Sequence, residues 1–280
     1  MTDAANSSGF SLSSLQPNNY NGGVHMNYNL KARLKKGERV MGTMISLFDH
    51  PEIAKIVQLC GFDYFIIDCE HGNFDYTTVA RILTVAREVG ICGMVRIPEP
   101  RREVVLKFMD MGAGGLLLPN TETVEHARAL VEHAKYAPLG NRGVQLSRGH
   151  SGFEKVSNPT EFMKKKNEET LLLIQIESPI GIKNIDELLA VEGIDAAFIG
   201  PNDLSQSLGI MGQFENPVFI TALDKIIAAA KKRQKFSGAH FQVASALAPW
   251  IAKGMTLNLW ANEIVMMMNG AKEGMAVLKK

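Results

Sequence analysis

The alternation of short apolar runs with amphipathic stretches predicts a (β/α)8 barrel over residues 30–280. Two observations support this fold. Eight runs are almost continuously apolar, as expected for the strands of a parallel sheet that is buried on both faces. Helix-like segments separate the runs, and eight such units in about 240 residues suit a closed barrel. An open doubly wound sheet would produce the same alternation and remains the alternative.

The predicted strands and helices follow one another in pairs. The strands are short and bounded by turn residues, and the helices show apolar residues at helical spacing. In chain order the pairs are 40–46 with 51–60, 64–68 with 77–89, 93–97 with 101–111, 115–118 with 122–135, 171–176 with 181–190, 196–199 with 216–234, 237–241 with 243–253, and 256–260 with 263–278.

Two segments depart from this rhythm. Residues 1–29 are rich in Ser, Asn and Gly and predict a flexible N-terminal tail. Residues 136–170 join the fourth and fifth strands and are rich in Gly and basic residues. A long connection inside a compact domain is usually a functional lid or a disordered segment, so we expect a loop here.

Composition excludes several classes of protein. The formal net charge of +1 argues against a general nucleic-acid binder, which needs a basic face. No apolar run reaches the roughly 18 residues of a membrane-spanning helix, and the N-terminus has no signal pattern. Cys60, Cys69 and Cys92 form no CxxC and lie in apolar segments. They are typical of reduced core thiols in a cytoplasmic protein.

Polar residues follow the fifth and sixth predicted strands. Side chains alternate along a strand, so Gln175 and Glu177 should both point into the barrel mouth. Asp203 follows the neighbouring strand, and two facing carboxylates repel unless a cation lies between them. Oxygen ligands with open positions suit Mg²⁺ or Mn²⁺. The alternative is that Glu177 pairs with Arg96 while Asp203 only caps the next helix.

The second and third strands also end in chemistry-bearing residues. A carboxylate such as Asp68 can orient the imidazole of His71 and raise its basicity, although a histidine here could equally be a satisfied polar residue. The Arg96 guanidinium needs an anion, either a substrate carboxylate or enolate, or internal Glu70 or Glu177. No predicted strand contains the lysine that a Schiff-base aldolase requires, so a metal would have to stabilise a carbanion.

Five motifs in this order resemble the HpcH/HpaI family of metal-dependent (class II) pyruvate aldolases. They are FDYFIIDCEHG at 62–72, VRIP at 95–98, KYAPLGNRG at 135–143, QIE at 175–177 and FIGPNDLS at 198–205. The similarity extends from about residue 37 to residue 275. The resemblance implies a (β/α)8 barrel, usually a homohexamer, whose last helix packs on or is swapped with a neighbouring subunit.

The resemblance also implies a chemistry. The enzyme would be a lyase that cleaves a 2-keto-4-hydroxy acid reversibly to pyruvate and an aldehyde, through a pyruvate enolate stabilised by Mg²⁺, Mn²⁺ or Co²⁺. The residues that match the family's functional positions are Glu177 and Asp203 as metal ligands, His71 with Asp68 as base, Arg96 as enolate-stabilising group, Gln175, Gly200, Pro201, Asn202 and Asp203 around pyruvate, and Asp110, which in relatives approaches the next subunit's site.

The chain departs from the family pattern where the aldehyde half should bind. The departures are Asn202, the stretch 144–150 and His240. We expect the long loop, through Arg142, Arg148 and His150, together with His240, to select an acceptor that carries a carboxylate. Other enolate reactions remain open, namely citrate-synthase-like condensation, oxaloacetate decarboxylation and cycloaddition. A non-catalytic metabolite sensor on the same scaffold is the alternative from another class.

Overall fold

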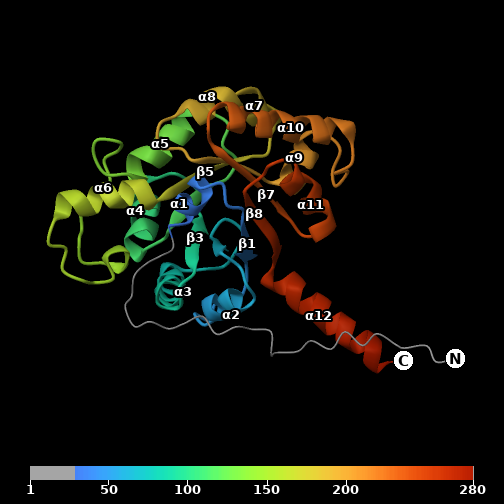
Figure 1. The fold of residues 1–280 in the computed structure, drawn as a ribbon, viewed down its shortest axis with the longest axis horizontal. Coiled ribbons are helices and arrows are strands. Elements are labelled where there is room, and N and C mark those ends of the chain that lie inside the picture. Colours follow the sequence, from blue (N-terminus) through green and yellow to red (C-terminus); the bar gives the residue numbers. More distant parts are fainter. Residues whose placement is uncertain (1–28, 280) are drawn as a thin grey trace.

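The computed structural model describes residues 29–279 and confirms the (β/α)8 barrel (Figure 1). Within those residues the strands pair in parallel in chain order, and β1 pairs with β8 to close the sheet. An open doubly wound sheet is therefore excluded. The strands are β1 (Val40–Ile45), β2 (Tyr64–Asp68), β3 (Cys92–Arg96), β4 (Gly115–Leu118), β5 (Leu171–Ile176), β6 (Ala196–Ile199), β7 (Phe236–Phe241) and β8 (Leu257–Asn262).

Helices surround the barrel, and each strand is followed in the chain by at least one helix. They are α1 (Leu30–Lys35), α2 (Ile53–Leu59), α3 (Tyr76–Val89), α4 (Arg102–Met111), α5 (Val124–Ala134), α6 (Pro159–Glu169), α7 (Pro179–Lys183), α8 (Ile185–Ala190), α9 (Pro201–Ser207), α10 (Pro217–Lys232), α11 (Ala244–Ala252) and α12 (Glu263–Leu278), with a 3₁₀ turn at Gly149–Ser151.

Three helices were not expected from the sequence pattern. Helix α6 occupies the end of the long connection, where Asn158 caps it and Pro159 begins it, and its one buried residue is Asn167. A polar helix of this kind shows no apolar periodicity. Helices α1 and α9 are only 6 and 7 residues long. Asn29, expected in the tail, is the N-cap of α1, and the rest of the expected tail lies outside the described residues.

Two hydrophobic layers hold the barrel together. One layer fills its interior and includes Leu30 and Leu34 of α1, which pack with residues of several strands such as Tyr64, Leu171 and Leu257. The other layer lies between strands and helices and contains Ile174, Ile176 and many helix residues. The alternation expected for β5 is confirmed, because Leu171 and Leu173 face inward while Ile174 and Ile176 face outward.

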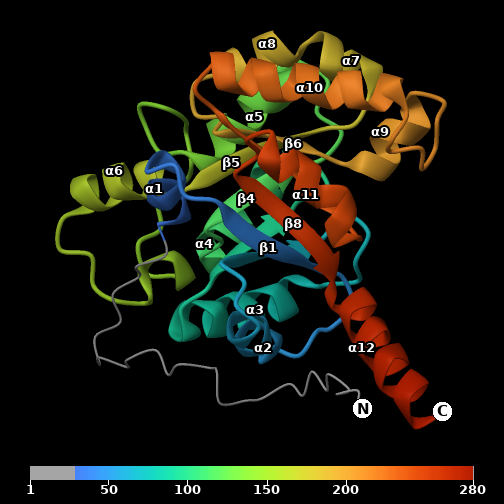
Figure 2. The ribbon, with the colours of Figure 1, turned by 45° about the vertical axis from the view of Figure 1, so that its right-hand side comes forward.

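Helix α12 extends away from the barrel in both views (Figures 1 and 2). Its one buried residue is Glu263, at its first position. The Glu263 carboxylate accepts hydrogen bonds from the backbone N–H groups of Ser46, Leu47 and Phe48, at 2.8, 2.5 and 3.0 Å. The rest of the helix presents apolar side chains to the surroundings, including Met267, Met268, Met275, Val277 and Leu278.

The cysteines are unpaired, as expected. Burial raises the pKa of the Cys92 and Cys69 thiols to about 12, so both are protonated at neutral pH. Cys60 differs from the expectation of a core thiol, because it lies at the exposed C-cap of α2. No helix within residues 29–279 is both long enough and apolar enough to cross a membrane.

Candidate active site

The carboxyl ends of the strands surround two adjoining cavities of about 330 and 360 Å³. His71 and Asp203 border both of them. The first cavity is lined by Met44, Ser46, Asp68, Arg96, Gln175, Phe198, Gly200, Pro201, Asn202, His240, Gln242 and Asn262, and the second by Glu70, Asn120, Glu177, Ser178, Gln206 and Ser207. The structure therefore brings together the residues expected to bind metal and pyruvate.

Asp68 and Arg96 form a buried ion pair at the ends of β2 and β3. The two residues face each other in the sheet register. Arg96 donates from Nε to Oδ1 at 2.9 Å and from Nη2 to Oδ2 at 2.6 Å. Burial alone would raise the pKa of Asp68, but the hydrogen bonds and charge of Arg96 outweigh it and hold this pKa below its usual range. Asp68 thus fixes the position of the guanidinium.

The expected pairing of Asp68 with the His71 imidazole does not occur in this structure. Both Asp68 oxygens bind Arg96, and Oδ1 also accepts the backbone N–H groups of Glu70 and His71. The His71 side chain is 68% exposed, and its Nε2 lies 3.9 Å from a Glu70 oxygen. Of the internal partners considered for Arg96, Glu70 is present at 3.1 Å. Glu70 therefore stands between Arg96 and His71, a role that its position in the motif did not reveal.

Gln175 and Glu177 extend from β5 into the mouth as expected. Gln175 Nε2 donates to Glu177 Oε2 at 2.6 Å, and the backbone N–H of Asn120 donates to Oε1 at 2.6 Å. Burial raises the pKa of Glu177, and the negative charges of Asp203 and Glu70 raise it further. Asn120 was not predicted. Its signal was an asparagine just after a strand, a residue type that tolerates its left-handed φ of 45°.

The segment after β6 completes this part of the site. Gly200 is the N-cap of α9, and Pro201 occupies the first turn. A Cβ atom at Gly200 would contact Gln175 Nε2 and Glu177 Oε2 too closely, so any larger residue here would force these two side-chain ends to shift. Asp203 lies in the first turn but is not the cap residue of α9. It borders both cavities instead, which favours a ligand role over the capping alternative.

The donor set fits a divalent cation bound in part by the protein. Within residues 29–279 no three His, Cys, Asp or Glu side chains form a complete metal cluster. Two carboxylates, Glu177 and Asp203, nevertheless border one cavity and repel each other. The Oε1 atom of Gln175 is buried beside them, and no described residue forms a hydrogen bond with it. Hard oxygen donors with coordination positions left open are what Mg²⁺ and Mn²⁺ accept.

The part of the first cavity around His240 is lined by neutral polar side chains. His240 lies there as expected and donates from Nε2 to the carbonyl of Ala261 at 2.9 Å. Burial lowers the pKa of His240 to about 4, so the ring is neutral at pH 7. Its neighbours are Asn202, which was expected, and Ser46, Gln242 and Asn262, which were not.

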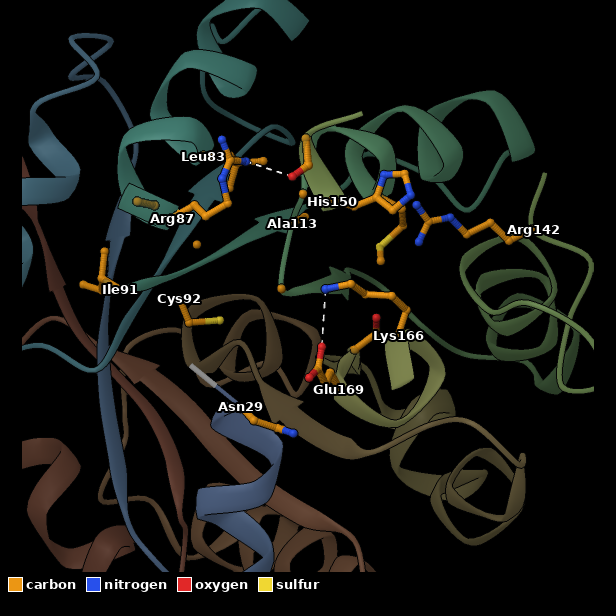
Figure 3. A pocket seen from close by; sticks show the side chains of 17 residues that line it. Asn29, Leu83, Arg87, Ile91, Cys92, Ala113, Arg142, His150, Lys166 and Glu169 are labelled. Carbon is orange, nitrogen blue, oxygen red and sulfur yellow. Dashed lines mark hydrogen bonds and ion pairs between the residues drawn. The ribbon is translucent and has the colours of Figure 1, made fainter. Parts of the chain in front are cut away.

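Asp110, Arg142 and His150 do not reach these cavities within one chain. They lie around the amino ends of the strands, where Arg142 and His150 border a separate cavity of about 80 Å³ with Cys92 and Thr170 (Figure 3). Cys92 and Arg96 occupy opposite ends of β3, roughly 13 Å apart by the rise of a strand. The expectation that this loop forms the mouth of its own barrel is therefore not met.

Local contacts explain where the loop lies. Arg142 Nη2 donates to Asp110 Oδ1 at 2.6 Å, and His150 Nδ1 lies 3.4 Å from the Asp110 carbonyl. Glycine allows close packing, because Gly149 lies against the end of α4 at Met111. Burial, with the nearby positive charge of Arg142, lowers the pKa of His150 to about 4. Arg148 precedes the 3₁₀ turn on the same loop and is exposed.

Comparison with known proteins agrees with this arrangement. Residues 43–257 match the HpcH/HpaI aldolase/citrate lyase family. The chain belongs to this family. It is 31% identical over 243 residues to the hydroxypyruvate/pyruvate aldolase of Roseobacter denitrificans, covering 86% of this chain and 93% of that protein.

Two solved structures show the same fold. An HpcH/HpaI aldolase from Desulfitobacterium hafniense is 34% identical, with a TM-score of 0.86 and coverage of 90% of this chain and 96% of that one. The citrate synthase SbnG is 26% identical, with a TM-score of 0.81 and coverage of 90% and 98%. Both the fold and the recognised family are thus confirmed.

Proposed function

We propose that this chain is a divalent-metal-dependent aldolase that reversibly cleaves a 2-keto-4-hydroxy acid to pyruvate and an aldehyde. One observation carries the proposal. The carboxylates of Glu177 and Asp203 and the guanidinium of Arg96 border adjoining cavities at the carboxyl end of the barrel. Active sites of (β/α)8 enzymes form at this end, the matching family is described as aldolase/citrate lyase, and the Roseobacter relative is an aldolase by description.

Arg96 and the strand ends bind the keto-acid half. Arg96 donates two of its five N–H groups to Asp68 and forms an ion pair with Glu70, which leaves N–H groups for substrate oxygens. Glu177 and Asp203 would hold Mg²⁺, Mn²⁺ or Co²⁺, with Gln175 beside them. When bound, the cation would act as a Lewis acid toward the keto group. Gly200 keeps the floor of the site free of side-chain atoms.

His71 is our candidate for the group that moves the proton of the 4-hydroxyl. His71 borders both cavities, and its Nε2 atom lies 3.9 Å from a Glu70 carboxylate oxygen. His71→Ala should lower turnover by roughly 10²–10⁴-fold while metal affinity, measured by calorimetry, is retained. If metal binding were lost together with turnover, His71 would be a ligand and not the proton carrier.

Metal removal tests the proposal directly. Dialysis against chelator should abolish aldol cleavage, and Mg²⁺, Mn²⁺ or Co²⁺ should restore it. Deuterium exchange into the methyl group of pyruvate should show the same metal dependence. Full activity in metal-free protein would contradict the metal assignment, and the absence of exchange with every metal would favour the sensor alternative.

A condensation reaction is the second candidate, because the citrate synthase SbnG shares the fold at 26% identity. Oxaloacetate decarboxylation and cycloaddition would use the same keto-acid half of the site. Product analysis separates these reactions. If aldol chemistry is the main activity, incubation with pyruvate and a panel of aldehydes should give new 2-keto-4-hydroxy acids. A parallel incubation with oxaloacetate tests for decarboxylation.

The proposal includes a homohexamer joined through α12. The exposed apolar side chains of this helix, and its projection from the barrel, support a contact with a neighbouring subunit. Sedimentation velocity should give a hexamer for the full chain and smaller species for Met268→Glu with Met275→Glu. A monomeric parent would contradict this part. The predicted cytoplasmic location rests on the cysteine pattern and stays a prediction.

A further inference from the structure

A fourth cavity, of about 900 Å³, opens at the amino end of the barrel. Its walls come from α1, from α6, and from segments 135–139, 192–195 and 234–236. Helix α1 precedes β1, and it lies beside α6 in Figure 2. This cavity is therefore on the opposite side of the barrel from Glu177 and Asp203, and the aldolase chemistry does not use it.

The cavity is lined by more ammonium groups than carboxylates. The lysines are Lys31, Lys35, Lys135, Lys164 and Lys235, and the acids are Glu168, Glu192 and Asp195. The two deepest lysines are Lys135 and Lys31, with 1% and 9% of their surface exposed. Ammonium groups gathered in this way repel one another, and an anion between them would relieve the repulsion.

Both deep lysines keep a proton for a further acceptor. Lys135 Nζ donates to the carbonyls of Asn167 and Thr170, each at 2.7 Å. Lys31 Nζ donates to Asp195 at 2.6 Å and approaches the same Thr170 carbonyl at 3.4 Å. An ammonium group has three donors, so each lysine has one left when it is protonated. Two ammonium groups that share one carbonyl oxygen lie close enough to bind one anion together.

The outer lysines increase the imbalance of charge. Lys235 uses one donor, on the carbonyl of Ile194 at 2.6 Å. Lys35 and Lys164 are exposed at the rim, and within residues 29–279 neither has an ion-pair partner. A purely structural role explains the carbonyl bonds of Lys135 and Lys31, but it does not explain three further lysines directed to the same cavity.

The same cavity has an apolar side. Leu34, Pro138, Leu139, Met163 and Phe236 line it together with the lysines. A bare inorganic ion would leave this surface uncovered, whereas an organic molecule would bury it. We propose that this cavity is a second ligand site, which binds a small organic anion with an apolar body and one phosphate or carboxylate group.

Protonation of Lys135 should make proton uptake on ligand binding depend on pH. Burial lowers the pKa of Lys135 to about 7, with Lys31, Lys35 and Arg142 lowering it further and Asp195 opposing them. A bound anion raises this pKa, so binding at pH 7.5 should take up a proton. At pH 5.5 Lys135 is already charged, and the uptake at this residue should disappear.

Isothermal titration of the full-length protein tests the proposal. Phenyl phosphate and benzoate serve as probes, with inorganic phosphate and phenol as single-feature controls. Phenyl phosphate or benzoate should bind at least tenfold more tightly than either control. Lys35→Gln with Lys164→Gln should weaken binding by about tenfold. Lys183→Gln with Lys225→Gln removes the same charge from exposed helix positions outside the cavity and should leave affinity unchanged.

Three results would overturn the proposal. The first is equal affinity in the two double variants. The second is displacement of the probe by pyruvate, or its loss in Glu177→Gln, because the anion would then lie in the catalytic cavity. The third is identical proton uptake at pH 5.5 and pH 7.5 in buffers of different ionisation enthalpy, which would place the anion away from Lys135. None of these results depends on aldolase activity, so they test this site independently of the proposed function.

Discussion

Asp68→Asn should weaken both the fold and the keto-acid site. The substitution removes the charge that neutralises Arg96, a residue 9% exposed, while Asp68 itself is 3% exposed. Removing one partner of a buried ion pair costs about 3–5 kcal/mol. Arg96 keeps its Glu70 contact at 3.1 Å, and the new amide oxygen can still accept from Nε, so the lower end, about 3 kcal/mol, applies.

Urea unfolding at one protein concentration measures this loss. With a slope of about 3 kcal/mol per molar, the midpoint should fall by about 1 M. Glu70→Gln is the matched control. It removes the longer, 26% exposed partner of the same arginine and should cost less than about 1 kcal/mol.

Kinetics then distinguish the two roles considered for Asp68. A displaced guanidinium should raise KM for the keto acid, whereas a carboxylate that acts on His71 should lower kcat and shift the pH profile. A parent-like urea midpoint in Asp68→Asn would refute the assignment of Asp68 as the residue that holds Arg96.

The remaining predictions concern a close contact and a buried imidazole. Gly200→Ala should displace the ends of the Gln175 and Glu177 side chains, disturb the 2.6 Å bond between them and lower the rate of cleavage, at a stability cost of about 1 kcal/mol because these side-chain ends can move, whereas Gly270→Ala, with open space around it, should do neither. His150 has a pKa of about 4 in the fold against an ordinary 6.5. Its contribution to the free energy of unfolding is therefore complete above pH 6.5 and is lost, by roughly 3 kcal/mol, as the pH falls through 4. The free energy of unfolding of His150→Phe should therefore change less over that pH window than that of the parent. Urea titrations at several pH values measure this, and an unchanged pH dependence would contradict the low pKa.

The barrel could be predicted because its signals are local. Each strand is an apolar run bounded by turn residues, and the closed order follows from repetition of one unit. The ends of β5 and β6 were equally predictable, since alternation alone directs Gln175 and Glu177 inward. Helix α6 was not predictable, because its stability comes from a cap and from contacts of Asn167 with Tyr136, and neither leaves an apolar period.

The partners of Asp68 and the place of the long loop could not be predicted from the sequence. Two acids within three residues, Asp68 and Glu70, are interchangeable by spacing, and only the sheet register puts Asp68 opposite Arg96. The long loop begins at the carboxyl-terminal end of α5, yet its direction depends on contacts with α4, such as the ion pair of Arg142 with Asp110, 32 positions apart. Contacts of that range carry no local signal.

Glu263 belongs to the projecting helix α12 but binds the barrel, so the whole helix cannot be removed without affecting the barrel. A shortened chain that ended at Asn262 would lose more than an exposed helix, because three amides of segment 46–48 would lose their common acceptor. Ser46 borders the first cavity, so the shape of the mouth would change with them. A chain shortened from this end should therefore retain Glu263 and enough of the following turn to hold it in place.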